Sequence, residues 1–242
     1  MDPILWVLLL SAAAAGAASL GAIPLVGRDD VPMAWIGWSN ALAGGLMLGA
    51  AHTLLSGGGS RPLASAIGAL FGVGVSYVSH FASGTEDLDL NQLGETDATY
   101  GSKVLLTSFL HSSAEGVAIG IAMVSDLRFG TFMALAIAVH NIPEATILCA
   151  VLRARGMSLI AAAALAVVIN SGQVLLALVT FALVPSLPGA EPFVVGFAVA
   201  ALIYLVLVEL LPGAYRQAGS TTIAVVTSVT MGVLIFLRST LS

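Results

Sequence analysis

The chain has 242 residues, of which 58% are hydrophobic and 9% are charged, and its formal net charge is −5. A soluble domain has about 25% charged residues and needs polar groups to cover its surface. The composition therefore excludes soluble enzymes and also nucleic-acid-binding proteins, which would show a basic patch. The single cysteine, Cys149, excludes an internal disulfide and a cysteine-rich metal site.

Eight apolar runs, separated by polar and turn residues, are each long enough to cross a hydrocarbon core of roughly 30 Å as an α-helix. Lipid cannot satisfy free backbone groups, and no segment alternates with the period of a β-barrel, so each run is predicted to be helical. The expected fold class is all-α, a polytopic membrane protein with one transmembrane domain over residues 1–242. The expected spans are approximately residues 3–27, 31–56, 62–83, 102–124, 129–152, 157–184, 190–214 and 220–238.

The connections between these runs are short, apart from the acidic and polar stretch 84–101. Five of the eight Lys and Arg residues follow the first, third, fifth and seventh runs, and three lie on the opposite side. The positive-inside rule then places loop 84–101 in the cytoplasm and both termini outside. We expect a multi-pass protein of the cell membrane.

Ionisable side chains inside the apolar runs mark candidate functional residues, because an acid at mid-bilayer costs at least about 2.5 kcal/mol. His111 and Glu115 are four residues apart, and so are His140 and Glu144, which places each pair on one helix face. His111 lies roughly 14 Å from the start of its span and His140 roughly 17 Å from the start of the next. Both pairs are therefore expected near the membrane midplane.

Two imidazoles and two carboxylates at one depth are the ligands that a borderline divalent cation such as Zn²⁺ needs, and the ion would neutralise the carboxylates. The alternative is that each Glu is protonated or hydrogen-bonded to its own His as a structural pair. A structural pair explains a single His-x-x-x-Glu motif more readily than it explains two such motifs at equal depth on consecutive helices. Pro143, inside the second motif, frees the carbonyl of Val139 and predicts a kink beside His140.

The motifs His111-Ser112-Ser113-Ala114-Glu115-Gly116 and His140-Asn141-Ile142-Pro143-Glu144 resemble the fourth- and fifth-span signatures of the ZIP (Zrt-, Irt-like) metal transporters. The resemblance extends along most of the chain, through weaker likenesses at residues 41–48, 170–173 and 209–212. It implies eight helices in a 3+2+3 plan, with the first three and last three spans as inverted repeats. It also implies metal uptake toward the cytoplasm.

The resemblance further implies a soft ligand at Met47 and a second metal position beside the first. This sequence departs from the family pattern at Asn141, Ala145 and Val174. The residues expected at the second position, Ser112, Asn141 and Gln173, are all neutral. We therefore expect one strong site and a weaker adjacent one.

The expected topology places three more ionisable residues along a path for the ion. His52 would lie toward the outer end of its span, and His80 and Glu209 toward the cytoplasmic end of theirs. These residues could capture and release metal, although an interfacial cap or a snorkelling group is an equal alternative for each.

Zinc is the expected transported substrate, and Fe²⁺, Mn²⁺, Co²⁺ and Cd²⁺ suit the same ligands. The expected partners are the metal ion and the lipid bilayer, a homodimer is compatible with the sequence, and no nucleic acid or catalytic cofactor is expected. A membrane-embedded metalloenzyme is an alternative, but His-Glu-x-x-His and Glu-x-x-His are both absent. We therefore expect no enzyme, and a passive divalent-cation channel remains the other alternative.

Overall fold

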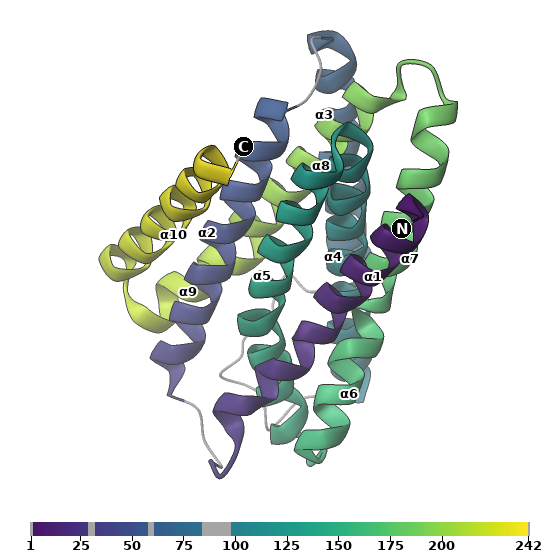
Figure 1. The fold of residues 1–242 in the computed structure, drawn as a ribbon. Coiled ribbons are helices and arrows are strands. Elements are labelled where there is room, and N and C mark those ends of the chain that lie inside the picture. The colour runs from purple at the N-terminus through teal and green to yellow at the C-terminus, as the bar shows by residue number, and fades with distance from the viewer. Residues whose placement is uncertain (1, 29–31, 58–60, 84–97, 242) are drawn as a thin grey trace.

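The computed structural model describes residues 2–28, 32–57, 61–83 and 98–241, and within them it contains helices and no strand (Figure 1). Most of the helices lie roughly side by side, so the chain runs up and down through a bundle. The elements, in chain order, are α1 (Pro3–Ala17), the 3₁₀-helix η1 (Ala18–Leu25), α2 (Met33–Gly57), α3 (Pro62–Ser83), α4 (Ala98–Ser125), α5 (Leu127–Ala154), α6 (Leu159–Ile169), α7 (Ser171–Leu183), the 3₁₀-helix η3 (Val184–Ser186), α8 (Ala190–Leu205), the π-helix η4 (Val206–Leu210), α9 (Leu211–Ala218) and α10 (Ser220–Leu241).

The ends of the helices follow from local sequence. The Asp126 carboxylate accepts a hydrogen bond of 2.8 Å from the Phe129 amide, so α5 begins with only this one residue between it and α4. Gly189 and Gly219 have φ values of 79° and 80°, a left-handed backbone that glycine adopts without a steric penalty. Gly189 precedes α8 and Gly219 follows α9, so the chain reverses direction at both places.

Six helical runs among the described residues are long and apolar enough to cross a bilayer, which makes the chain a multi-pass membrane protein. α2 and α4 coincide with the second and fourth expected spans but are not among the six, since polar and small residues lower their mean hydropathy. The count of eight membrane spans therefore stays a prediction. The six runs are Pro3–Leu25, Pro62–Phe81, Leu127–Ala154, Leu159–Ser186, Ala190–Ala218 and Ser220–Thr240.

The boundaries and continuity of several expected spans need correction. The first expected span changes from an α-helix to a 3₁₀-helix at Ala18, and the sixth is divided at Asn170. The seventh passes through a π-helix and continues to Ala218, because Pro212 lies in the first turn of α9 where its missing N–H costs nothing. α4 begins at Ala98, inside the expected loop 84–101, whose residues 84–97 lie outside the described part of the chain.

The helices pair in a pattern that repeats. α3 packs along α8, and α10 packs along α2; α4 packs on α7, and α5 packs on α1 and η1; α2 contacts α5, and α8 contacts α4. The pattern is an exchange of the two halves of the chain: α1 with η1 corresponds to α6 with α7, α2 to α8 with η4 and α9, α3 to α10, and α4 to α5. Under this exchange, each contact in the list becomes the other contact of its pair. α4 and α5 themselves are in contact and lie between the two sets.

Small residues allow the closest of these approaches. A Cβ atom at Gly45 of α2 would lie 2.5 Å from the Thr227 carbonyl oxygen and 2.8 Å from Thr230 Cβ, both on α10. The α2 and α10 backbones can therefore come this close only if residue 45 has no side chain.

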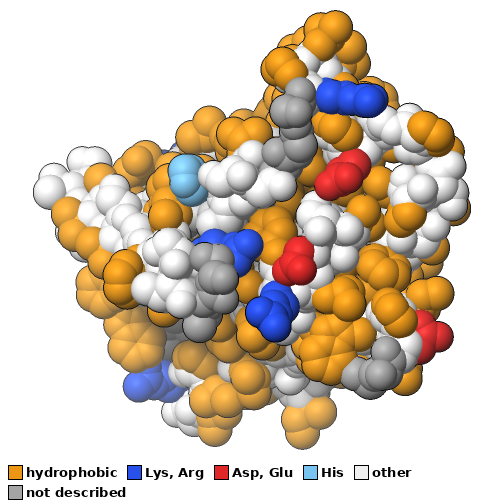
Figure 2. Space-filling view, turned by 45° about the horizontal axis from the view of Figure 1, so that its top comes forward, with side chains coloured by type: hydrophobic (Ala, Val, Ile, Leu, Met, Phe, Trp, Pro, Cys, Tyr) orange, Lys and Arg blue, Asp and Glu red, His pale blue; other side chains and the backbone are white. Residues whose placement is uncertain are grey.

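Seen obliquely from the top of Figure 1, the surface of the bundle consists mostly of hydrophobic and uncharged groups (Figure 2). Lys, Arg, Asp and Glu side chains are few on this face and scattered among hydrophobic ones. Buried side chains form one large core that runs through most of the bundle. A second, smaller core lies where η1, the later part of α5 and α6 meet.

The α2–α10 contact gives a prediction for stability. Gly45→Ala should lower the free energy of unfolding by about 1–3 kcal/mol, because the new methyl group overlaps the α10 backbone. Gly74→Ala is the matched control, since a Cβ atom at Gly74 meets nothing within 4 Å. Thermal unfolding of the purified variants in detergent measures both; equal midpoints would contradict the close packing at Gly45.

Candidate metal centre

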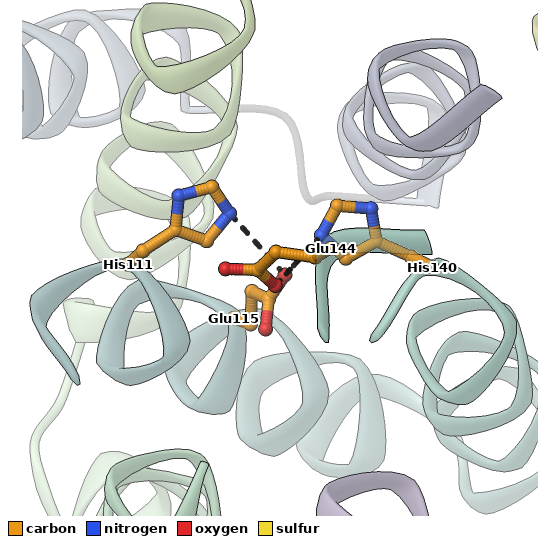
Figure 3. A group of neighbouring side chains, drawn as sticks. All are labelled: His111, Glu115, His140 and Glu144. Atoms are coloured by element: carbon orange, nitrogen blue, oxygen red, sulfur yellow. Dashed lines mark ion pairs between the residues drawn. The ribbon is translucent and has the colours of Figure 1, made fainter. Parts of the chain in front are cut away.

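Four side chains from two adjacent helices converge in the middle of the bundle (Figure 3). His111 and Glu115 project from α4, and His140 and Glu144 project from α5, one helical turn apart in each case. Figure 3 shows the two carboxylates between the two imidazole rings. Glu115 is 0% exposed, His140 1% and His111 3%, whereas the Glu144 side chain is 17% exposed.

The ligand-type atoms of this group lie close together. His140 Nε2 lies 2.7 Å from Glu115 Oε1 and 3.6 Å from Glu144 Oε2, and His111 Nε2 lies 3.6 Å from Glu115 Oε1. The His111 and His140 rings are parallel within 3°, with centroids 5.9 Å apart. One ligand atom from each of the four residues fits within 4.8 Å of the others.

The backbone of α2 fixes the orientation of His140. Its Nδ1 lies 3.2 Å from the Ala43 carbonyl oxygen, and because a carbonyl only accepts, Nδ1 carries the proton in this hydrogen bond. In a neutral ring Nε2 then presents a lone pair toward Glu115 Oε1, which also has only lone pairs when ionised. At 2.7 Å these atoms repel each other unless a proton or a metal cation lies between them.

The geometry fits a divalent cation. Zn²⁺ takes imidazole nitrogen and carboxylate oxygen at about 2.0–2.2 Å, so tetrahedral ligand atoms are about 3.3–3.6 Å apart. Two of the three distances given above are 3.6 Å, at the upper end of this range, the third is shorter at 2.7 Å, and no ligand atom need lie farther than 4.8 Å from another. Two carboxylates carry a charge of −2, so one divalent ion would leave the buried group neutral. His111 Nε2 and Glu115 Oε2 are buried without a hydrogen-bond partner, as expected of atoms available to an ion.

A cavity of about 140 Å³ adjoins the group on one side. His111 forms part of its wall, together with His80 near the end of α3 and Glu209 in η4. The Glu209 carboxylate lies between the His111 and His80 rings, with Oε2 3.7 Å from His111 Nδ1 and Oε1 3.5 Å from His80 Nδ1. Sequence reasoning placed His80 and Glu209 toward the cytoplasmic end of their spans; in the structure both line the cavity next to His111, and their position relative to the membrane stays a prediction.

The opposite side of the group is nearly closed. A cavity of about 10 Å³, about enough for one water molecule, is lined by Glu115 and His140 and otherwise by apolar side chains. Met47 is among them and is 2% exposed, so it faces the same small space as two of the four residues. The remaining lining residues are Leu46, Ala50, Ala136, Ile137 and Leu202.

The residues expected at a second metal position make hydrogen bonds within the protein. Asn141 Nδ2 donates to the Ala14 carbonyl oxygen at 2.9 Å and to Gln173 Oε1 at 3.1 Å, and Gln173 Nε2 donates to the Ser11 carbonyl oxygen at 3.4 Å. These bonds tie α1, α5 and α7 together. Ser112 Oγ donates to the Ile169 carbonyl oxygen at 3.1 Å, just before the break between α6 and α7. A weaker second site at these residues stays a prediction.

Two other expectations concern His52 and Pro143. His52 is exposed on α2 and lines none of the cavities described above. α5 remains helical through Pro143, so the expected kink is not visible as a break in the helix. Pro143 has no N–H to donate to the Val139 carbonyl, and the Val139 side chain lies on the outer surface of α5.

Sequence reasoning missed the backbone partners of the site. The carbonyl groups of Ser11, Ala14 and Ala43 hold the Gln173, Asn141 and His140 side chains, and a carbonyl group has no signature in the sequence. An indirect signal exists, because Ala14 and Ala43 are in alanine- and glycine-rich segments that allow another helix to approach closely.

One known protein is similar to this chain across most of its length. A protein of Arabidopsis thaliana with the name "putative zinc transporter" is 31% identical over 226 residues, which cover 90% of this chain. The chain spans about 36% of the length of that relative. No protein-family model matches the sequence.

The amide pair beside the site gives a prediction. Asn141→Ala and Gln173→Ala should each lower the free energy of unfolding by about 1–3 kcal/mol, because each leaves a buried polar partner unsatisfied. The double variant should lose about 1 kcal/mol less than the sum, since the two side chains share one hydrogen bond. Thr227→Val, which removes a separate hydrogen bond from α10 to the Ala41 carbonyl, should be additive with Asn141→Ala. Additivity in both pairs would contradict the amide bridge.

Proposed function

We propose that this chain is a ZIP-family carrier that moves divalent metal cations across the membrane into the cytoplasm, with zinc as the favoured substrate. The observation that carries the proposal is the buried group of two imidazoles and two carboxylates on α4 and α5. His111, Glu115, His140 and Glu144 are the proposed ligands of the ion in transit.

The charge of the group favours a divalent ion. A monovalent ion would leave one buried negative charge, and an anion would add to the two already present. Imidazole and carboxylate ligands also suit Fe²⁺, Mn²⁺, Co²⁺ and Cd²⁺. The similarity to a relative named as a zinc transporter favours zinc among them.

The unequal cavities support a path for the ion. The larger cavity, with His80 and Glu209 on its wall, leads away from the ligand group on the side that the positive-inside rule assigns to the cytoplasm. We propose that His80 and Glu209 receive the ion from His111 during release. On the other side the ion would pass Met47, and His52 would be an initial contact farther out.

The pairing of the helices supports a 3+2+3 plan with eight spans. The first three and last three expected spans make corresponding contacts, and α4 and α5 lie between them. An arrangement of this kind is typical of inverted repeats with a binding site at the midplane.

A carrier fits the cavities better than a channel or an enzyme. A channel needs a continuous path, whereas apolar side chains including Met47 and Leu202 nearly close one side of the group. A hydrolytic metal site keeps an open position for water, and all four ligands proposed here come from the protein.

Flux through reconstituted protein tests this function. Proteoliposomes with the parental chain should take up radiolabelled zinc with saturation, and Glu115→Ala or Glu144→Ala should reduce the initial rate to the level of empty liposomes, because each change removes a ligand and a negative charge. Cys149→Ala is the control; the thiol is buried in the smaller core and should be dispensable for flux. Undiminished uptake by the glutamate variants would contradict the site, and no saturable uptake by the parental chain would contradict the function.

Binding should also depend on pH. Metal requires neutral imidazole and ionised carboxylate, so protons compete with the ion and the dissociation constant for zinc should rise as pH falls from about 7.5 to about 5.5. Glu144→Gln, which removes one competing carboxylate, should show weaker binding and a shallower dependence. Equilibrium binding of zinc to purified protein measures both, and a flat profile for the parental chain would argue against histidine ligation.

A further inference from the structure

An apolar groove with a volume of about 600 Å³ opens on the outer surface of the bundle between η1, α2 and α5. Its volume is within the range of about 300–1,000 Å³ for small-molecule sites. Trp35, Trp38 and Leu42 of α2 form one wall, and Val139 and Pro143 of α5 form the other. The groove is separate from the metal group, which lies on the buried side of α5.

The groove is exposed where the protein meets lipid. Trp38 is 45% exposed and Val139 51%, and an exposed apolar surface on a membrane protein is covered by acyl chains. The two tryptophans lie in the first two turns of α2, at an end of the helix, where amphipathic aromatic rings mark the interface between lipid and water. The groove therefore extends from the interface toward the middle of the bilayer.

A positive charge lies beside one wall of the groove, against Trp35. The guanidinium carbon of Arg28 is 4.5 Å from the centre of the Trp35 ring, a cation–π contact that holds the side chain at the wall. A guanidinium group binds phosphate through paired N–H donors. The groove thus combines an apolar slot in the hydrocarbon with a cation at the interface, which matches a molecule with an acyl chain and a phosphate group.

We propose that this groove binds a membrane phospholipid, with an acyl chain along Trp38, Leu42 and Val139 and the phosphate on Arg28. A second copy of the chain could also cover an apolar surface. A rigid helix of that copy would leave the concave slot unfilled, whereas a flexible acyl chain fills it. The acyl chain would pack against the same two turns of α5 that carry His140 and Glu144, through their outward-facing neighbours Val139 and Pro143.

Tryptophan fluorescence can test the proposal without any metal. The chain has three tryptophans, so Trp6→Phe leaves Trp35 and Trp38, both on the wall of the groove, as reporters. Phosphatidylcholine with brominated acyl chains, added at low mole fraction to the purified protein in detergent, should quench them with saturation. Brominated diacylglycerol, which has the same chains and no phosphate, should bind about fivefold more weakly. If Trp6→Phe does not fold, the parental chain gives the same comparison over a constant Trp6 background.

Variants separate the two parts of the site. Val139→Phe fills the slot and should abolish saturable quenching by both lipids. Arg28→Gln should weaken phosphatidylcholine about fivefold and leave diacylglycerol unchanged, whereas Arg216→Gln, at an exposed arginine on α9, is the matched control and should change neither.

Three outcomes would overturn the proposal. Quenching that rises in proportion to the bromolipid fraction and ignores Val139→Phe would indicate bulk lipid contact alone. Equal binding of both lipids without any effect of Arg28→Gln would remove the phosphate from the site. Efficient disulfide formation between two copies of the Trp38→Cys chain would show that the groove is a contact between subunits. None of these results bears on metal transport, so failure here leaves the proposed function intact.

Discussion

The Glu115 carboxylate has no exposure to solvent, and the centre of this bundle must accommodate that constraint. An ionised carboxylate in such surroundings costs several kcal/mol unless a positive charge and hydrogen-bond donors compensate it. His140 is the nearest group, at 2.7 Å, and His111 follows at 3.6 Å. Because the Ala43 carbonyl holds the proton on Nδ1 of His140, a neutral ring offers only a lone pair to Glu115. The arrangement therefore needs either an additional proton or a cation at its centre.

Two departures from regular α-helix lie close to this group. The π-helix η4 contains Glu209, the break at Asn170 precedes Gln173, and Ser112 binds the carbonyl of Ile169 at that break. π-Bulges and broken helices free backbone groups and re-aim side chains, and inside a membrane they persist only where protein or a polar cavity satisfies them. At the break near Asn170, the Ser112 hydroxyl and the Asn170 amide donate to the carbonyls of Ile169 and Ala166, and η4 borders the cavity beside His111.

Several features of the fold and of the candidate site could be predicted from sequence. Apolar runs predicted helices at the observed places, and the spacing of four predicted that His111 lies over Glu115 and His140 over Glu144. The equal depth of the two motifs follows from counting 1.5 Å per residue.

Other features depend on contacts that no spacing specifies. Periodicity cannot show a π-helix or a break at Asn170, because the apolar pattern continues through both. For the same reason the contact between Glu209 and His111 could not be predicted from the sequence. The amide bond between Asn141 and Gln173 depends on the packing of α5 against α1 and α7, which are remote in the chain.

Side-chain hydrogen bonds join the helices into two groups, and the bonds within each group differ in kind from the contacts that the candidate ligands make beyond their own group. α1, α4, α5, α6 and α7 are joined by bonds from Asn141, Gln173 and Ser112 to backbone carbonyls, and α2 and α10 are joined by a bond from Thr227. Contacts from the first group to α2 and η4 involve the candidate ligands themselves, through His140 to Ala43 and His111 to Glu209. The neutral bonds inside the group do not depend on what the site holds. The His140–Ala43 and His111–Glu209 contacts do, because a cation bound by these rings would change, for example, the attraction between His111 and Glu209. A bound ion can therefore alter how the ligand-bearing helices sit against α2 and η4 without loosening the helices from one another.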